Sequence, residues 1–289
     1  MKAPWVIDFD ASVGSLPEER RLDMSAHQES LRFACRRSQL RAWGDRLPQA
    51  CGDGPVFIGS GDFHHLSLPL IQRSIARHGP LRVLVLDNHP DNMRYPWGVH
   101  CGSWVRDAAR MPGVLGIDVI GITSSDIVGL HVLENNLAPL WRGRLRYGAI
   151  GLDLGAWRRL RLERAVRSYT HAEQLLQASL ADLQAGDEPL YLSIDKDVLD
   201  TCDVRTNWDQ GCMRSSAMLA FVQALRDRIV AVDVTGDVSA YRYQSLWKRY
   251  LSQLDGQELQ APPDAATLSH WQEQQRQVNR AIIASLAAT

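Results

Sequence analysis

The sequence predicts one α/β domain in three layers, with helices covering both faces of a mostly parallel sheet. Apolar runs rich in branched residues recur along the 289-residue chain, and segments with helical spacing lie between them. Such runs suit strands that are buried on both faces, as in parallel sheets. No internal repeat or clear linker divides the chain, so we expect residues 1–289 to form a single domain.

The expected elements follow from these patterns in chain order. Strands are expected at 55–59, 81–87, 116–122, 147–152, 189–195 and 229–234. Helices are expected at 171–184, at 215–228 and, as a C-terminal helical segment, at about 264–287. Strands that alternate with helices in this way are typical of a parallel sheet with crossover connections.

The composition is that of a globular protein without a strongly charged surface. Hydrophobic residues make up 45% of the chain, charged residues 22%, and the formal net charge is −1. This balance provides no basic field, so we expect no nucleic-acid partner and no membrane partner. No apolar run approaches the ~20 residues that span a bilayer, and Asp8 and Asp10 interrupt the N-terminal stretch, unlike a signal peptide. Five cysteines without a CxxC pair suit a reducing compartment, so we expect a cytoplasmic protein.

Charged residues follow directly after two of the predicted strands. One strand ends in Asp87, His89 and Asp91, and another ends in Asp195 and Asp197. Side chains two apart on an extended chain point the same way, and ligands of parallel sheets bind at the carboxyl ends of strands. Carboxylates crowded without a counter-charge would raise one another's pKa values. Divalent cations such as Mn²⁺, which accept oxygen and imidazole ligands, would remove this conflict.

A third strand end adds a histidine to this set of possible ligands. The run at 55–59 leads into a glycine-rich turn that carries His64 and His65, and either of them is a possible ligand. A cluster of this size suits two ions, which can activate a water molecule for hydrolysis.

Three blocks of the chain resemble, in order, motifs of the arginase/agmatinase (ureohydrolase) family. They are GSGDFHH at 59–65, DNHPD at 87–91 and SIDKDVLD at 193–200, within a matching region of about 55–240. The resemblance implies an arginase-like fold, a binuclear manganese centre and hydrolysis of a C–N bond in a small guanidino or amidino compound. It also implies a homo-oligomer.

Carried over by position, the resemblance implies two sets of manganese ligands. One set is His64, Asp87, Asp91 and Asp195, and the other is His89, Asp91, Asp195 and Asp197. Asp91 would then bridge both ions and orient the nucleophile. A gapless match favours His64, and His65 stays the alternative. The segment at 98–105 is similar to the family segment that carries a proton-relaying histidine, which implies that His100 protonates the leaving nitrogen.

The match differs at the position where the family places a glutamate that reads the guanidinium group. Gly236 stands there, and Asp233 and Asp237 are the nearest carboxylates. We expect one of these two aspartates to read the positive end of the substrate.

The loop that grips the amino-acid end of the substrate in arginases is shorter here and has different residues. Arg94 and Arg205 are candidates to receive a carboxylate, and Trp97 and Trp208 are candidates to stack on a planar group or a cation. Asn207 lies in the same loop as Trp208 and is a further substrate-binding candidate. This replacement argues against free arginine as the substrate.

Three functions are compatible with these patterns. The leading hypothesis is a binuclear manganese hydrolase for a guanidino or amidino compound other than arginine. The first alternative is a deacetylase-like amide hydrolase with one zinc ion, and the second is a non-catalytic binding protein with the same fold. All six ligand candidates are present, which argues against the second alternative.

Overall fold

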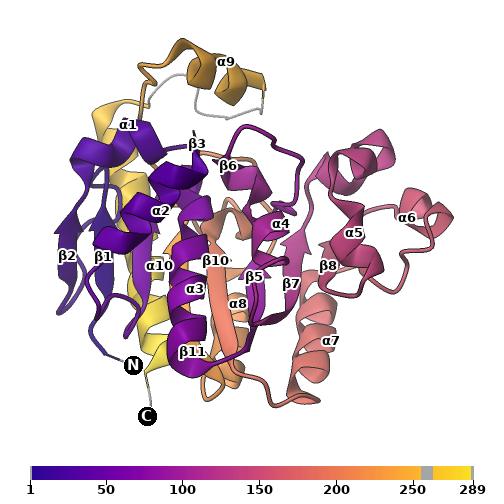
Figure 1. Cartoon of the computed structure of the whole chain (residues 1–289). Coiled ribbons are helices and arrows are strands. Elements are labelled where there is room, and N and C mark those ends of the chain that lie inside the picture. Colours follow the sequence, from indigo (N-terminus) through magenta and orange to yellow (C-terminus); the bar gives the residue numbers. More distant parts are fainter. Residues whose placement is uncertain (1, 255–262, 288–289) are drawn as a thin grey trace.

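Parallel strands form a single sheet through the centre of the computed structural model, which describes residues 2–254 and 263–287 (Figure 1). Among these residues the sheet has nine strands, and every pairing within it is parallel. The spatial order is β2 (Arg20–Asp23), β1 (Trp5–Asp8), β4 (Val56–Gly59), β11 (Ile229–Thr235), β10 (Leu190–Asp195), β5 (Leu81–Leu86), β7 (Val114–Ile122), β8 (Leu145–Ile150) and β9 (Val166–Tyr169).

The six predicted strands occupy the interior of this sheet, where both faces are covered. Every residue of β10 is buried, and in β5 only Arg82 is partly exposed. The strands β1, β2 and β9 lack a long apolar run and were not predicted. Each has only four residues, and β2 and β9 lie at the edges of the sheet, where exposed polar side chains are tolerated.

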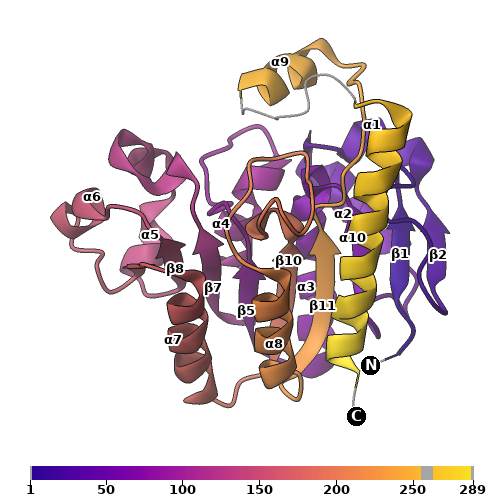
Figure 2. The same cartoon turned by 180° about the vertical axis from the view of Figure 1, so that it is seen from behind.

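Helices cover both faces of the sheet and complete the predicted three layers. On one face lie α2 (Arg37–Arg46), α3 (Ser67–His78) and α4 (Trp104–Ala108) (Figure 1). On the other face lie α7 (Ala172–Gln184), α8 (Ser215–Leu225) and α10 (Ala265–Leu286) (Figure 2). Each layer buries its own apolar cluster against the sheet. The predicted α/β fold class is therefore confirmed.

The other described α-helices lie near the carboxyl edge of the sheet or in the crossover connections. They are α1 (Gln28–Leu31), α5 (Leu137–Trp141), α6 (Gly155–Arg159) and α9 (Leu246–Leu254). A second, two-stranded antiparallel sheet joins β3 (Ala34–Cys35) to β6 (Val99–His100) and pairs Ala34 with His100. None of the helices described is long and apolar enough to cross a membrane.

The C-terminal helix α10 matches the segment predicted at about 264–287. Asp264 caps its first turn by accepting hydrogen bonds from the backbone N–H groups of Ala266 and Thr267. One face of the helix buries Val278 and Ile282 in the apolar cluster that it shares with α7 and α8. The helix therefore contributes directly to the core.

We predict that Ile282→Ala lowers the free energy of unfolding by about 2–5 kcal/mol, because it leaves a cavity at a fully buried position. Urea denaturation monitored by circular dichroism measures this change. Arg280→Ala is the matched control, since Arg280 is exposed on the same helix and alanine keeps the helix propensity. Equal losses in the two variants would contradict the packing role assigned to α10.

Candidate metal centre

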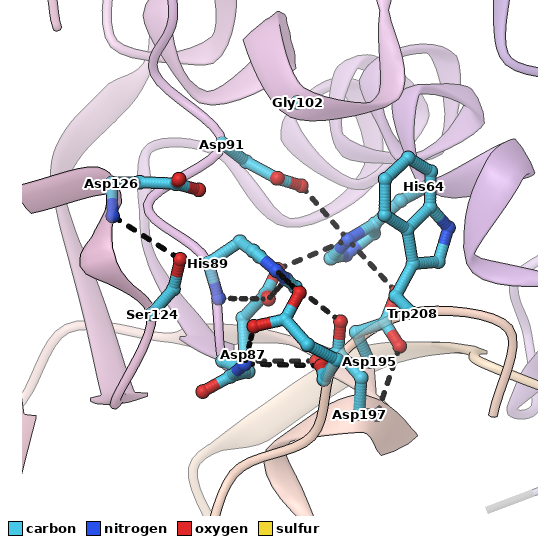
Figure 3. A network of polar contacts seen from close by, with 12 residues as sticks. His64, Asp87, His89, Asp91, Gly102, Ser124, Asp126, Asp195, Asp197 and Trp208 are labelled. Atoms are coloured by element: carbon cyan, nitrogen blue, oxygen red, sulfur yellow. Dashed lines mark hydrogen bonds and ion pairs between the residues drawn. The ribbon is translucent and has the colours of Figure 1, made fainter. Parts of the chain in front are cut away.

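Six side chains from three strand ends meet in one largely buried cluster at the carboxyl edge of the sheet (Figure 3). The first lies in η2 (Gly61–Leu66), a 3₁₀ turn after β4; three follow β5; one ends β10 and one lies in η6 (Lys196–Val198). They are His64, Asp87, His89, Asp91, Asp195 and Asp197. Gly61 permits this approach, because a Cβ atom there would lie 2.8 Å from Oδ2 of Asp195.

His64 turns its Nδ1 atom toward three carboxylates. Nδ1 lies 3.2 Å from Oδ2 of Asp87, 3.1 Å from Oδ2 of Asp91 and 3.5 Å from Oδ2 of Asp195. Its Nε2 atom lies 2.9 Å from Oγ of Ser193, and that hydroxyl donates to Oδ1 of Asp233 at 2.7 Å. Because the hydroxyl proton is already engaged, Ser193 accepts from Nε2–H. Burial opposes a charge on His64, but hydrogen bonds with Asp87 and Asp91 raise its pKa well above the usual value, so Nδ1 also carries a proton that a bound metal ion would displace.

His89 has the same orientation toward a second group of carboxylates. Its Nδ1 atom lies 2.9 Å from Oδ2 of Asp197 and 3.6 Å from Oδ1 of Asp87. Its Nε2 atom lies 2.7 Å from Oδ1 of Asp209. Each histidine therefore presents one nitrogen to the cluster while the other is held from behind, which is the usual arrangement of metal-binding histidines.

Asp87 is the carboxylate that the two possible metal-binding groups share. One group is His64, Asp87 and Asp91, the other is Asp87, His89 and Asp197, and within each group the ligand atoms lie within 4.8 Å of one another. The family resemblance implies that Asp91 bridges the two ions, and it places Asp195 in both ligand sets as well. The backbone of Asp91 itself has a φ of 45°, and its Oδ2 atom accepts a hydrogen bond from Nε1 of Trp104 at 2.6 Å. Asp87 directly follows β5 and contacts both histidines, so this geometry favours Asp87 at the shared position.

The structure separates the two adjacent histidines that the sequence left as alternatives. His64 contacts the carboxylates, whereas no contact between His65 and these carboxylates occurs among the described residues. His65 is fully buried, and its burial lowers its pKa well below the usual value, so it is neutral. This geometry favours His64 as the ligand.

The four carboxyl groups of the cluster differ in their pKa values. Burial and the nearby Asp87 carboxylate raise the pKa of Asp91 to about 7. Burial and neighbouring carboxylates also raise the pKa values of Asp195 and Asp197. Burial opposes the charge of Asp87 too, but hydrogen bonds with His64 and His89 lower its pKa to about 2. Cations among these oxygen and nitrogen atoms would relieve the repulsion, so the donor set fits divalent metal ions such as Mn²⁺.

Above the cluster lies a cavity of about 270 Å³ that opens to solvent. Its outer wall carries further acidic side chains, which we call the acidic rim: Asp126, Glu134 and Asp209. No lysine or arginine lines this cavity among the described residues. The sequence interpretation missed the acidic rim, although Asp126 follows closely after a predicted strand and could have been found by the same strand-end rule that located Asp87.

Two other predicted residues also line the cavity. His100 ends β6, its Nδ1 atom accepts a hydrogen bond from the backbone N–H of Gly102 at 2.9 Å, and its ring packs against Phe33 and Tyr95. Trp208 also lines the cavity, its ring stacks on the same Phe33 ring with centroids 6.4 Å apart, and its Nε1 atom donates to Oδ1 of Asp62 at 3.1 Å. Packing therefore fixes His100 where it can reach a molecule in the cavity.

The two aspartates predicted to replace the family glutamate do not line the cavity. Asp237 is fully buried beneath the cluster, where Nζ of Lys196 lies 2.5 Å from its Oδ1 atom. Asp233 is fully buried and accepts hydrogen bonds from the hydroxyls of Tyr191 and Ser193. Because internal partners engage both carboxylates, neither has the access that a substrate-reading residue requires.

The other candidates for substrate contact also lie outside the cavity. Arg94 and Arg205 are exposed, and Trp97 is 73% exposed beside a separate surface groove. The amide of Asn207 is used within the protein, because Nδ2 donates to the carbonyl of Ser239 and Oδ1 accepts from its N–H. Of the tryptophans and arginines predicted to contact substrate, only Trp208 lines the cavity.

Similarity to known proteins is weak at the level of sequence. No family model matches the sequence. In sequence, the chain is 26% identical over 196 residues to a protein of Thermotoga maritima described as uncharacterized. The match covers 68% of this chain and 61% of that protein, which is less than two thirds of the relative's length.

Similar solved structures include several ureohydrolases. The arginase from Bacillus caldovelox is 14% identical with a TM-score of 0.58, covering 99% of this chain and 98% of that one. The agmatine ureohydrolase of Thermoplasma volcanium is 11% identical with a TM-score of 0.53, covering 98% and 89%. The proclavaminate amidino hydrolase from Streptomyces clavuligerus is 18% identical with a TM-score of 0.52, covering 94% and 75%. The chain therefore has the arginase-like α/β fold, as its motifs predicted.

No side chain fits at position 236, where the ureohydrolase family places its substrate-reading glutamate. Gly236 has φ of +88°, and a Cβ atom there would lie 2.5 Å from Oδ1 of Asp195 and 2.6 Å from the backbone nitrogen of Lys196. We predict that Gly236→Ala lowers the free energy of unfolding by more than the roughly 1–2 kcal/mol that a left-handed backbone alone costs an alanine. Thermal and urea denaturation measure the loss.

Gly151→Ala is the matched control for this variant. Gly151 has φ of +70°, and an added Cβ atom there would meet nothing within 4 Å. The control therefore reports backbone strain without a steric clash. If both variants lose the same stability, the contact of position 236 with Asp195 is not as close as described.

Proposed function

We propose that this protein is a metal-dependent hydrolase that cleaves a C–N bond in a small, positively charged guanidino or amidino compound. The observation that carries the proposal is the cluster itself, in which two oriented histidines and four carboxylates lie beneath an acidic cavity. The arginase-like fold supports it, because solved structures of this fold include proteins named arginase, agmatine ureohydrolase and proclavaminate amidino hydrolase.

The residues fit two Mn²⁺ ions. In the proposed assignment, His64, Asp87 and Asp91 hold one ion and Asp87, His89 and Asp197 hold the other, with Asp195 beside His64 as a further ligand. Bound divalent metals supply Lewis-acid activation of water at neutral pH. The overlap of two ligand groups favours two ions over the single zinc of a deacetylase-like amide hydrolase. A homo-oligomeric assembly and a cytoplasmic location stay predictions.

Two protein side chains have proposed roles in proton transfer and orientation. His100 lines the cavity and is proposed to protonate the leaving nitrogen, for which an imidazole is suited near neutral pH. Asp91 is held by the indole of Trp104 and is proposed to accept a hydrogen bond from the attacking water. Both roles require only groups that line the cavity.

The charge of the cavity defines the class of substrate. Two bound Mn²⁺ ions would offset the charge of the four buried aspartates, so the acidic rim carries the remaining negative charge of the cavity. No described lysine or arginine lines the cavity, so this rim attracts a cationic molecule and repels an anionic group. The α-carboxylate of arginine would find no cationic partner among these residues. We therefore propose a substrate without a carboxylate, whose positive charge faces Asp126 and Glu134.

The proposed function is tested with the full chain reconstituted with Mn²⁺. A panel of guanidino and amidino compounds with amine, neutral and carboxylate tails is assayed for release of urea, ammonia or the product amine. We expect turnover that requires Mn²⁺ and is weakest with carboxylate tails. No turnover with any compound of the panel would refute the hydrolase proposal.

We predict that the acidic rim acts mainly on substrate binding. Asp126→Asn should raise the KM for a cationic substrate several-fold and change kcat less, because it removes one attractive charge at the cavity wall without altering the metal cluster. Steady-state kinetics at constant ionic strength measures both constants. Glu163→Gln is the control, since Glu163 is exposed and does not line the cavity. An unchanged KM in Asp126→Asn would remove this residue from the substrate site.

We predict different metal stoichiometries for two aspartate variants. Asp87→Ala should lose tight binding of both ions, because Asp87 belongs to both ligand groups. Asp91→Ala should lose one ion, because it belongs to a single group. Metal content per chain after dialysis, measured by mass spectrometry, distinguishes the two. If Asp91→Ala loses both ions and Asp87→Ala does not, Asp91 and not Asp87 holds the shared position.

A further inference from the structure

Asp209 combines solvent exposure with a fixed position at the metal cluster. Its side chain is 51% exposed at the mouth of the cavity, yet its Oδ1 atom lies 2.7 Å from Nε2 of His89. Its Oδ2 atom accepts a hydrogen bond from Nδ2 of Asn88 at 3.1 Å, and the same Nδ2 atom donates to the backbone carbonyl of Asp209 at 3.0 Å. Both carboxylate oxygens are therefore held.

Asn88, which donates hydrogen bonds to Asp209, is itself held by hydrogen bonds to other residues. It is fully buried, and its Oδ1 atom accepts hydrogen bonds from the backbone N–H and the hydroxyl of Thr123, at 3.1 and 2.6 Å. Its own backbone N–H donates to Oδ1 of Asp197 at 3.0 Å. Asn88 thus joins the ends of β5, β7 and β10 to the loop that carries Asp209.

The contact with Asp209 keeps a proton on Nε2 of His89 when Nδ1 binds a metal ion. Both ring nitrogens face carboxylates, Nδ1 toward Asp197 at 2.9 Å and Nε2 toward Asp209 at 2.7 Å. A metal ion in the cluster would take the lone pair of Nδ1, and because an ionised carboxylate only accepts hydrogen bonds, Nε2 would keep its proton. His64 has a different support, because its Nε2 atom contacts the neutral hydroxyl of Ser193.

We propose that Asp209 is a positioning residue that holds His89 in its metal-binding orientation and strengthens one of the two metal sites selectively. The inference rests on the proposed function, because it concerns the ion that His89 would bind. A carboxylate behind a ligating imidazole fixes the ring and makes the ligand more basic, and loss of such a partner typically weakens metal binding by about 10–100-fold. The His64 site has no direct contact of this kind with an anion.

The same loop also forms part of the cavity wall. Trp208 precedes Asp209, lines the cavity and packs edge-on against the ring of His89, with ring centroids 6.1 Å apart. A shift of this loop would therefore move the cavity wall and the support of one metal ligand together.

The test measures Mn²⁺ affinity of the full chain by calorimetry, without substrate. We expect two binding events in the unmodified protein. In Asp209→Ala, one dissociation constant should rise about 10–100-fold while the other changes little. Asp209→Glu, which keeps the carboxylate, should recover part of the loss. Circular dichroism verifies that each variant is folded.

Asp126→Asn is the matched control, since it removes one negative charge from the same cavity and Asp126 has no described contact with His89. Equal effects of Asp209→Ala and Asp126→Asn would show that Asp209 acts only through its charge and would overturn the inference. Two unchanged dissociation constants in Asp209→Ala would also overturn it and leave the proposed function standing. Absence of Mn²⁺ binding by the unmodified protein would overturn both.

A second readout reports the position of the proton directly. In protein loaded with diamagnetic Zn²⁺ and labelled with ¹⁵N-histidine, the Nε2–H signal of His89 should be visible and slow to exchange with solvent. Asp209→Ala should lose this protection, whereas Asp126→Asn should keep it. An unprotected His89 signal in the unmodified protein would contradict the proposed hydrogen bond.

Discussion

Repulsion between four carboxylates held at one edge of the sheet is the constraint on which the rest of the site depends. Asp87, Asp91, Asp195 and Asp197 are all buried, and burial adds the cost of desolvation to their mutual repulsion. The protein places two imidazoles among them and anchors each from the far side of the ring. Such an arrangement would destabilise the fold if it served only packing, but it is suited to binding divalent cations.

The surroundings of the cluster show how this chain departs from the family that its motifs resemble. At position 236 the backbone passes so close to Asp195 that only glycine fits. Directly below, Lys196 and Asp237 form a buried ion pair, and Asn279 from α10 contacts both. Because both members of the pair are fully buried, the strand that carries the substrate-reading glutamate in the family contributes no accessible charge here. The accessible carboxylates at the cavity are instead those of the acidic rim.

The contacts behind the two histidines connect the cluster to different parts of the fold. His64 is supported through Ser193 and Asp233, which belong to adjacent central strands. His89 is supported by a loop residue, Asp209, which Asn88 holds in place. One possible metal site is therefore built into the sheet, whereas the other depends on a loop that also shapes the cavity. A change in the position of this loop would therefore affect both metal binding and the shape of the cavity.

The sequence by itself determined the fold class, the interior strands and the strand ends at which chemistry would lie. Continuous apolar runs report burial on both faces, and alternation on an extended chain reports which neighbours point together, so Asp87, His89, Asp195 and Asp197 could be grouped without coordinates. Short edge strands such as β2 carry no such pattern. Only the tertiary structure decided that Asp87 lies in both ligand groups, that Lys196 removes Asp237 from the cavity, and that Asp126 and Asp209 line it. These facts depend on distances between segments far apart in the chain, and spacing along one segment contains no information about them.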